Sequence, residues 1–556
     1  MDSNDLYYNT REVITLQAGP VTNLVCAHYW NYLTDFCAKP LQPSSVICHQ
    51  TLLDGSSHSW FPRALCIDFA DSVDYGLSCG NDLSVSRGLS ATCPSWSGRV
   101  QEIYRSTATT GSGNKAEQTF YNGSSAEKGK QLNRLSKWNV CLSSHLQRHW
   151  MNMNNRHGPV CHIPDCLTKF TETVESNHQY LNYLSALPSH AQGRDILRTG
   201  SALAEDFEDR LRQIAEHCDR PTGFHLLTDA ETGIAGVASS MLDHVVDEFP
   251  NRAILTVPIY QTAALARLQL GRRYQLMSRA NQLTLLVGLE SLSDNRAAWL
   301  PLDVSAFTTN SSWGCLATGL TAACFDCLST PLRLADEHKG IRLDDLVSSV
   351  KLATGGRRML SARFGFIDIT NADYPLSLQW KVTSPYFIAN SDLNAPAPCY
   401  QKAASFWRQL VLRGIPEEEP TVGKLMRCVS SPPAAYLNGE TTNCNWCLPM
   451  HSGVKSIHSF TAGSHLCIQR RTAAPFCDQP TRVCAASLLD SPSADSPDVA
   501  GLVQLVKFFL QQNQQQRSHL SSKSPIDGIE NDLWLECLER ARCLLLGTYS
   551  VLDGKA

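Results

Sequence analysis

Patterns of apolar residues are clearest in the first half of the chain. Residues 11–17 form a short β-rich run that breaks at Ala18-Gly19-Pro20, and apolar positions then recur at helical spacing from Leu24 to Trp30. This pattern predicts a strand, a tight turn and a helix. A second strand is expected at residues 64–68, between a Phe-Pro-Arg entry and an acidic exit.

The strongest periodicity lies between residues 200 and 260. A helix is expected around residues 205–218, where one face carries Phe207, Leu211, Ile214 and Cys218. Strands are expected at 223–228 and 253–257, on either side of a second helix. The side of that helix expected to face the sheet consists of Met241, Leu242, Val245, Val246 and Phe249. Alternating strands and helices predict a doubly wound parallel α/β sheet.

Other segments have weaker patterns. Residues 75 to about 190 are rich in Gly, Ser, Asn and Thr, which predicts a flexible insertion at about 80–190 with a helix around Trp138–Trp150. The later elements expected are a helical stretch at 262–292, strands at 364–369 and 409–415, loops around a few short elements at 430–500, and a final helix at 531–545.

The composition narrows the class of protein. The 556 residues suffice for several domains of ~100–200 residues each. A formal net charge of −4 gives no electrostatic reason to bind nucleic acid. No apolar run reaches the ~18 residues of a membrane-spanning helix, and the acidic start resembles neither a signal peptide nor an Arg-rich import sequence. A cytosolic protein is expected, with its 22 cysteines reduced and mostly buried.

Short motifs with catalytic potential lack the right context. Gly76 to Gly80 fits the G-x-S-x-G pattern, with Ser78 as its serine. A nucleophile elbow needs a strand before the serine and a helix after it, whereas an acidic loop precedes this motif and Asn81-Asp82 follows it. A surface loop is therefore favoured over a hydrolase.

Three cysteine pairs have spacings that zinc tolerates. They are Cys444 and Cys447 with His451 and His458, Cys161-His162 with Cys166, and Cys324 with Cys327. None has a second C-x-x-C at finger or ribbon distance, and the last pair lies in an apolar helical run. Reduced structural thiols are favoured over a metal site, and no metal ligands are predicted.

A glycine turn after a strand is the best candidate for phosphate binding. Gly233 and Gly236 open the helix that follows strand 223–228, where free N–H groups and the helix dipole attract anions. Asp229 and Glu231 lie beside the same turn and would repel a triphosphate unless a metal intervened. No Gly-Lys-Ser/Thr sequence completes a P-loop.

The ordered segments resemble the tubulin superfamily, and within it the Misato family of tubulin-like proteins. The tubulin-like blocks are residues 11–19, 61–68 and 222–252. The features similar to the Misato family are His28-Tyr29-Trp30, a long insertion after the second strand, Phe207–Leu211 leading into Asp229-x-x-x-Gly-x-x-Gly236, and the segments 315–320 and 411–415. The resemblance is dispersed over about residues 11–70, 130–420 and 525–553.

The resemblance implies a tubulin-like architecture in three parts. Residues 11–300 are expected to form an N-terminal domain of the nucleotide-binding type, with the flexible insertion at about 80–190. Residues 301–430 are expected to form a second α/β domain, and residues 431–556 a loop-rich segment with C-terminal helices. The family pattern places a degenerate nucleotide site at Gly19, Asn23, Asp68, Gly233 and Gly236.

Departures from the tubulin pattern argue against catalysis. Pro20 removes an N–H that would face phosphate, and Ala70 stands where tubulin has an acid that helps to hold magnesium. Thr308–Trp313, which resembles the loop that carries a catalytic acid to a neighbouring subunit, has no carboxylate. The resemblance therefore implies no GTPase activity, with residual binding of GTP or GDP with magnesium at most. The alternative is a GTP-binding, self-assembling GTPase.

The Misato family is associated with mitochondrial distribution, morphology and inheritance, and in animals with mitochondrial fusion and with spindle and tubulin-folding complexes. The resemblance implies a protein of the cytoplasm and mitochondrion that acts through protein–protein contacts. Its expected partners are proteins at the mitochondrial surface, tubulin or cytosolic chaperonin. Association with the outer membrane is expected to be peripheral. A factor in tubulin folding or spindle assembly is the other alternative that the resemblance leaves open.

Overall fold

The fold is that of a computed structural model. It describes residues 11–34, 46–53, 57–69, 142, 146, 160–163, 187–219, 221–261, 272–292, 297–307, 315–333, 341–354, 358–368, 379–383, 385, 407–413, 456–462, 466–468, 481–490, 497–518 and 531–543.

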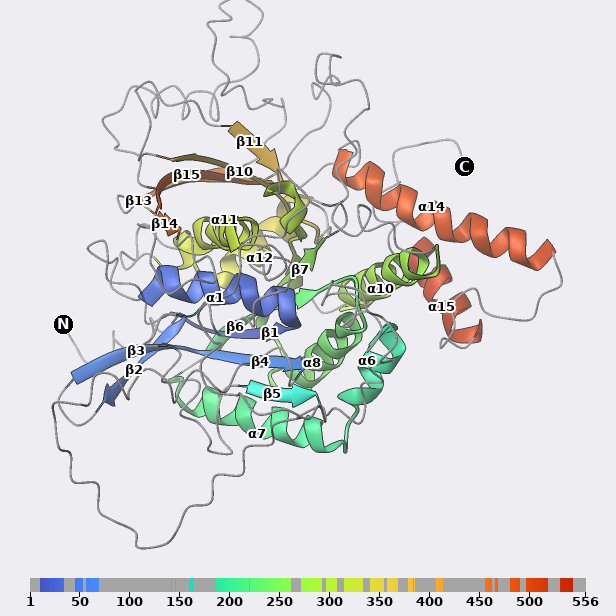
Figure 1. The fold of residues 1–556 in the computed structure, drawn as a ribbon, viewed down its shortest axis with the longest axis horizontal. Helices are drawn as coiled ribbons and strands as arrows, with labels where there is room; N and C mark the ends of the chain where they lie inside the picture. The colour runs from blue at the N-terminus through green and yellow to red at the C-terminus, as the bar shows by residue number, and fades with distance from the viewer. Residues whose placement is uncertain are drawn as a thin grey trace, which may run out of the picture.

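A parallel sheet forms the centre of the N-terminal half (Figure 1). Its strands are β1 (Glu12–Ala18), β4 (Ala64–Phe69), β5 (Val160–Ile163), β6 (Pro221–Asp229), β7 (Ala253–Tyr260), β8 (Ala297–Trp299) and β9 (Leu302–Asp303). The order is β5-β4-β1-β6-β7-β8, β9 also pairs with β7, and each of these pairings is parallel. A hairpin of β2 (Cys48–Leu53) and β3 (Ser57–Pro62) precedes β4.

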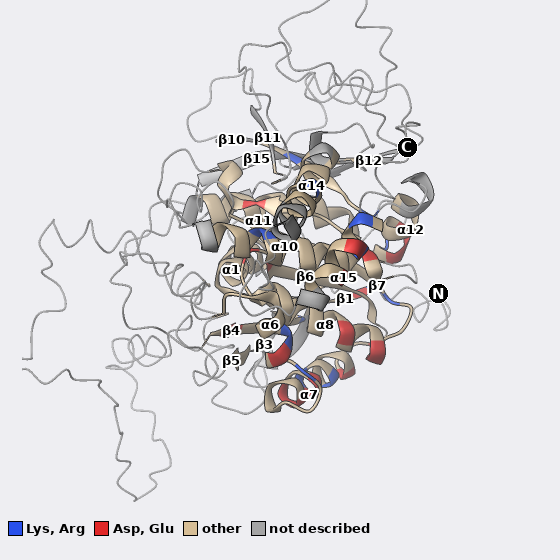
Figure 2. Ribbon diagram, turned by 90° about the vertical axis from the view of Figure 1, so that its right-hand side faces the viewer, with Lys and Arg blue, Asp and Glu red and all other residues tan. Residues whose placement is uncertain are grey.

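Helices cover both faces of this sheet, because apolar residues project from both sides of its buried strands. One face packs against α1 (Pro20–Thr34), α11 (Cys315–Arg333) and α12 (Leu343–Thr354). The other face packs against α6 (His190–Ile196), α7 (Ala202–Glu216), α8 (Ile234–Glu248) and α10 (Arg272–Ser291). The predicted doubly wound α/β sheet is confirmed, and it is consistent with a tubulin-like domain. In Figure 2 charged residues lie mainly on outer helices such as α7 and α8, whereas β1 and β6 carry almost none.

A second, mixed sheet lies beyond α11 (Figure 1). Its strands are β10 (Ser361–Asp368), β11 (Gln379–Val382), β12 (Trp407–Arg413), β13 (Ser456–Ala462), β14 (Leu466–Ile468) and β15 (Thr481–Asp490). The order is β11-β10-β15-β12-β13, and β14 also pairs with β15. Helix α11 contacts α1 on one side and β12, β14 and β15 on the other, so it lies between the two sheets. The short helix η7 (Val304–Phe307) leads from the first sheet towards α11.

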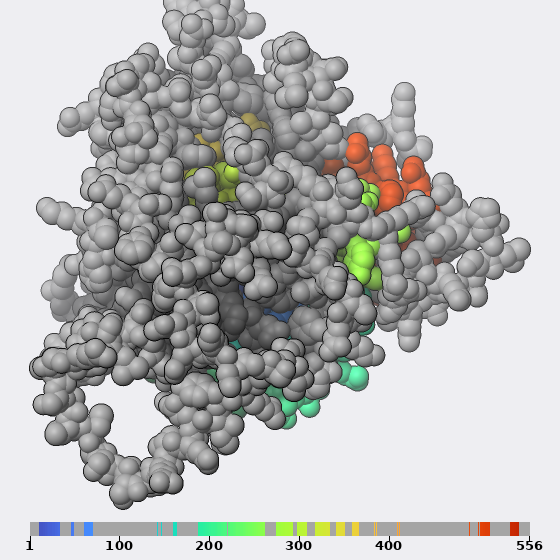
Figure 3. Space-filling model, in the orientation of Figure 1, coloured from blue at the N-terminus to red at the C-terminus, as the bar shows by residue number. Residues whose placement is uncertain are grey.

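Two C-terminal helices pack on α10, one of the helices that cover the first sheet. They are α14 (Pro497–Ser518) and α15 (Asn531–Ala541), and the second confirms the final helix expected from the sequence. The rings of Phe509 and Trp534 meet edge to face at 5.1 Å, and the Arg279 guanidinium lies over the Phe508 ring. Figure 3 shows α10 and α14 side by side at the surface.

Three details differ from what the sequence predicts. Val246 is 40% exposed, whereas Val245 is 1% exposed, so Val246 does not face the sheet. The predicted insertion contains a strand of the first sheet, since Val160–Ile163 is the edge strand β5. The 430–500 segment contains β15, which lies inside the second sheet, so that sheet extends past residue 430. Most of the insertion, including most of the helix expected at Trp138–Trp150, lies outside the described residues.

Candidate functional site

The first candidate loop connects β1 to α1 at the carboxyl end of the sheet. Gly19 has a φ of 99°, a left-handed conformation that glycine adopts without strain. Its N–H donates to the Ile67 carbonyl at 3.0 Å, and its carbonyl accepts from the Asn23 N–H at 2.8 Å. Gly19 therefore makes the predicted tight turn and places the start of α1 over the ends of β1 and β4.

The carboxylate of Asp229 fills the amino end of α1. Its Oδ1 accepts from the Thr22 N–H at 2.8 Å and from the Thr22 hydroxyl at 2.6 Å, and its Oδ2 accepts from the Val21 N–H at 3.3 Å. Asp229 is 1% exposed, and Thr22 is completely buried. Burial raises the pKa of Asp229 to about 6, although these hydrogen bonds act in the opposite direction.

Asn23 and Asp68 form the second part of the same site. The Asn23 amide donates from Nδ2 to Asp68 Oδ2 at 2.6 Å and to the Ile67 carbonyl at 3.2 Å. The other oxygen of Asp68 accepts from the Phe69 N–H at 2.7 Å. Both Asn23 and Asp68 are completely buried at the end of β4. The structure thus brings Gly19, Asn23 and Asp68 together, as the resemblance implies, and adds Asp229 to them.

Gly233 and Gly236 serve a different purpose from phosphate binding in this structure. The Gly233 N–H donates to the Leu187 carbonyl at 2.8 Å, so it is already paired with backbone. A Cβ on Gly233 would collide with Leu187 and with the Ser189 carbonyl, and a Cβ on Gly236 would collide with the His190 carbonyl. These glycines let the start of α6 cross the first turns of α8 in backbone contact.

Glu231 is the second carboxylate that the sequence places beside the glycine turn. Its Oε2 accepts from the Gln261 N–H at 2.8 Å, and its Oε1 accepts from Gln282 Nε2 at 3.0 Å. The Glu231 carbonyl also accepts from Asn281 Nδ2 at 3.2 Å, which ties the loop to α10. Both loop carboxylates are therefore held by internal donors.

The segment that covers the glycine turn is fixed by the same helix. Asn281 accepts from the His190 N–H at 2.8 Å and donates to the Pro188 carbonyl at 2.8 Å. His190 Nε2 lies 2.9 Å from the Ser239 hydroxyl on α8. Burial lowers the pKa of His190 to about 3, so the imidazole is neutral at pH 7. A neutral, buried histidine next to a serine that also bonds within its own helix is a packing contact.

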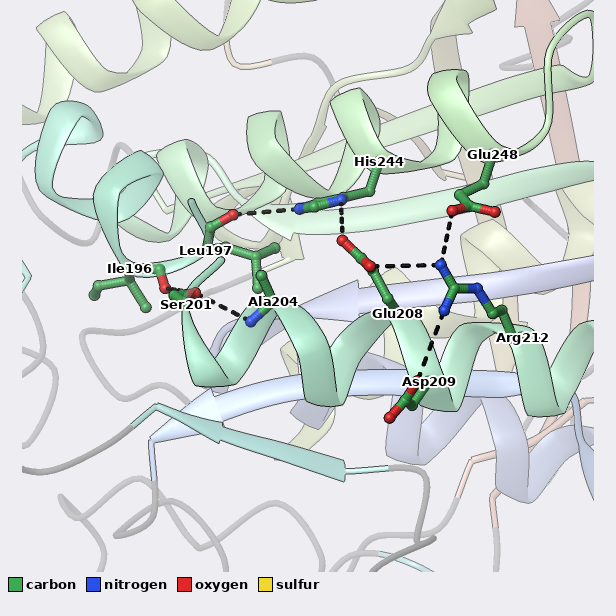
Figure 4. A network of polar contacts seen from close by, with 9 residues as sticks. All are labelled: Ile196, Leu197, Ser201, Ala204, Glu208, Asp209, Arg212, His244 and Glu248. Carbon is green, nitrogen blue, oxygen red and sulfur yellow. Dashed lines mark hydrogen bonds and ion pairs between the residues drawn. The ribbon is translucent and has the colours of Figure 1, made fainter. Parts of the chain in front are cut away.

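Helices α6, α7 and α8 are joined by a further polar network near the surface (Figure 4). His244 Nδ1 lies 3.0 Å from Glu208, and its Nε2 lies 3.3 Å from the Leu197 carbonyl. Arg212 pairs with Glu248 on α8 at 2.9 Å and with Glu208 at 3.5 Å on its own helix. This network links three helices on the side of the sheet away from α1.

The residues present do not fit a nucleotide phosphate. Pro20 has no N–H, and the next two N–H groups of α1 already donate to Asp229. The glycine turn at α8 is closed by Leu187 and His190. Ala70 and Thr308–Trp313 lie outside the described residues.

Other chemistry suggested by the sequence is placed as follows. Cys324 and Cys327 are completely buried in α11, and Cys161 is completely buried in β5. Ser78, Cys166, Cys444, Cys447 and His451 lie outside the described residues, and His458 belongs to strand β13. Across the described part of the chain, no group of three His, Cys, Asp or Glu side chains could hold a metal, and no helix is long and apolar enough to cross a membrane.

The sequence identified Asp229 but not its effect. The sequence predicts that an acid directly after a buried strand and before a helix repels phosphate, whereas Asp229 binds the start of a helix 207 residues earlier in the chain. Thr22 supplies two of the three donors, and no local pattern in the sequence pairs it with Asp229.

Comparison with known proteins points to one family. Residues 11–121 match the Misato Segment II tubulin-like domain. Protein misato homolog 1 of Danio rerio is 27% identical over 268 residues, which cover 44% of each chain. Protein misato of Drosophila melanogaster is 23% identical over 326 residues, covering 53% of this chain and 52% of that protein. Protein DML1 of Gibberella zeae is 24% identical over 370 residues, covering 64% of this chain and 67% of that protein.

The match to the zebrafish and fly proteins spans about half the length of each relative. The first loop, between β1 and α1, lies inside the matched domain. The resemblance is confirmed: the chain is similar to the Misato family of tubulin-like proteins.

Proposed function

We propose that this chain is a non-hydrolysing tubulin-like protein that organises the distribution, morphology and inheritance of mitochondria through contacts with other proteins. The relationship to the Misato and DML1 proteins supports the mitochondrial role. The observation that carries the non-catalytic part is the closed first loop, in which Asp229 holds the donors of α1.

Partners follow from the same relationship. Proteins of the mitochondrial surface, tubulin and cytosolic chaperonin are the proposed partners, and the chain divides between cytoplasm and the outer face of the mitochondrion. Attachment to the outer membrane is peripheral in this proposal. Washing isolated mitochondria with carbonate then releases the protein, and retention in the membrane pellet would contradict peripheral attachment.

The cellular test is depletion followed by re-expression. Loss of the protein should collapse or aggregate the mitochondrial network and make its inheritance by daughter cells unequal, and the full chain should restore both. A normal network after complete depletion would overturn the mitochondrial role. A rescue that fails only when tubulin or chaperonin binding is lost would assign the contact that matters.

The biochemical test is single-turnover hydrolysis of GTP by purified protein with and without magnesium. No turnover above buffer is expected at any protein concentration, because the first loop offers no free donors to developing charge. Magnesium-dependent turnover that rises with concentration and disappears in Asp68→Asn would instead support the self-assembling GTPase.

A further inference from the structure

The amino end of α1 has the features that attract an anion in other proteins. The first N–H groups of a helix lack partners within the helix, and the helix dipole concentrates positive charge there. In this chain Pro20 contributes no N–H, so Val21 and Thr22 supply the first backbone donors. Both donate to Asp229, and the Thr22 hydroxyl does so as well.

The position of Asp229 is fixed by the sheet. Ala18 and Thr228 are paired in the β1–β6 ladder, so the residues that follow them, Gly19 and Asp229, leave neighbouring strands side by side. A Cβ on Gly19 would lie 2.6 Å from the carboxyl carbon of Asp229. Glycine at this position therefore provides the left-handed turn and leaves room for the carboxylate.

Burial leaves little access to these donors. Asp229 is 1% exposed, and Val21 and Thr22 are completely buried. An external phosphate could reach the three donors only by displacing a side chain that already satisfies them.

We propose that Asp229 is the built-in anion of this loop: its carboxylate takes the place of a phosphate oxygen at the start of α1 and closes the tubulin-type nucleotide site. The inference rests on the proposed non-hydrolysing role and gives it a structural cause. The chain retains the loop of a nucleotide-binding fold and uses it as an internal contact between β6 and α1.

The test removes the carboxylate from the full chain and offers other anions in its place. Asp229→Ala leaves three donors around the space of the lost carboxylate, where a phosphate oxygen of pyrophosphate or GTP can take its place. We expect its melting temperature to rise with added pyrophosphate beyond the rise in chloride of equal ionic strength. Equilibrium dialysis with labelled GTP should show at least tenfold tighter binding than to the wild type.

Glu231→Gln is the matched control. It removes a second buried carboxylate from the same loop, one that accepts hydrogen bonds from Gln261 and Gln282. This variant should respond to pyrophosphate and GTP no more than the wild type does. A folded Asp229→Ala that responds no more than Glu231→Gln would overturn the proposal.

If Asp229→Ala does not fold, hydrogen exchange of the wild-type protein tests the proposal. Hydrogen exchange in a peptide covering residues 18–24 should not change when pyrophosphate or GTP is added, and increased protection would overturn the proposal. The outcomes separate this inference from the function. GTP binding to the wild-type loop without turnover overturns the closed site alone, and a normal mitochondrial network after depletion overturns the cellular role alone.

Discussion

Arg63 and Glu12 form a buried ion pair in which Nη2 lies 2.6 Å from Oε1, with side chains 6% and 9% exposed. Arg63 also donates from Nη1 to the Cys48 carbonyl at 2.8 Å. The pair joins the start of β1 to the segment between β3 and β4, and the second bond adds β2. One arginine thus holds the hairpin against the parallel sheet.

Replacing Arg63 by methionine should be strongly destabilising, because it leaves the Glu12 carboxylate buried without its cation. We expect a loss of about 3–5 kcal/mol in the free energy of unfolding, measured by urea denaturation. Arg194→Met is the control, since it breaks an ion pair of the same 2.6 Å length whose side chains are both 54% exposed. That variant should lose at most about 1 kcal/mol, and equal losses in the two variants would contradict the argument from burial.

Adjacent valines on α8 should respond oppositely to a charge. Val245 is 1% exposed and packs against the sheet, so Val245→Asp should unfold the protein by burying an unpaired carboxylate. Val246 is 40% exposed, and Val246→Asp should remain folded with a change of about 0.5 kcal/mol or less. Far-ultraviolet circular dichroism and thermal melting distinguish the two. A folded Val245→Asp would show that the helix face is assigned incorrectly.

Gly236→Ala should destabilise the contact between α6 and α8. The added methyl group would meet the His190 carbonyl and the Arg194 N–H, which are backbone atoms that cannot rotate away. A loss of about 1–3 kcal/mol or more is expected from this overpacking. Gly288→Ala on α10 is the control, because its Cβ would meet only the Ser239 hydroxyl at 3.8 Å. It should gain up to about 1 kcal/mol from helix propensity, and a similar loss at both glycines would contradict the packing role.

Asp229 should make the stability depend on pH. Its pKa is about 6 in the folded protein against an ordinary value of 3.8, because burial disfavours the charged carboxylate. Between these values the folded state holds a proton that the unfolded state releases, so the contribution of Asp229 to stability falls as pH rises through about 6. The difference between the folded and the ordinary pKa corresponds to about 3 kcal/mol of unfolding free energy at 1.36 kcal/mol per pKa unit.

The measurement is the free energy of unfolding from pH 4 to pH 7.5 in the wild type and in Asp229→Asn. As the pH rises, the free energy of unfolding of the wild type should fall relative to that of Asp229→Asn. Parallel curves of the two proteins would contradict the prediction. Asp303→Asn gives a comparison, since burial also raises the pKa of Asp303 to about 6, on β9 and away from α1.

The sequence predicts strands β1, β4, β6 and β7 and helices α1, α7 and α8 because each has a local signal, whereas the short strands β5, β8 and β9 are not predicted. Buried strands such as β6 and β7 are short apolar runs, and α8 shows a helical period. The error at Val246 arises because this residue lies at the edge of the apolar stripe, where periodicity cannot distinguish burial from exposure. The place of β15 in the second sheet could not be predicted, because its partner strands β10 and β12 lie far earlier in the chain.

In the candidate site, too, the sequence predicts features that depend on neighbouring residues and misses contacts between residues far apart in the chain. The turn at Gly19 and the convergence with Asp68 follow from strands whose ends share one edge of the sheet. The role of Gly236 depends on His190, and the role of Asp229 depends on Thr22, and neither partner is close in sequence. A glycine pair after a strand suits a phosphate loop and a close helix crossing equally well, so only the three-dimensional contact separates them.

The position of β1 at the centre of the sheet has a consequence for biosynthesis. One edge of β1 pairs with β4 and the other pairs with β6. Ala18 therefore cannot pair on the second edge until the ribosome has synthesised Thr228. At ~5–20 residues per second, that interval is roughly 10–40 s of translation. Throughout it the nascent chain carries an apolar strand with an open edge, a feature prone to pairing with other chains. Ribosome-bound intermediates shorter than this cannot close the sheet, so the protein's yield in the cell depends on how well that edge is shielded during synthesis.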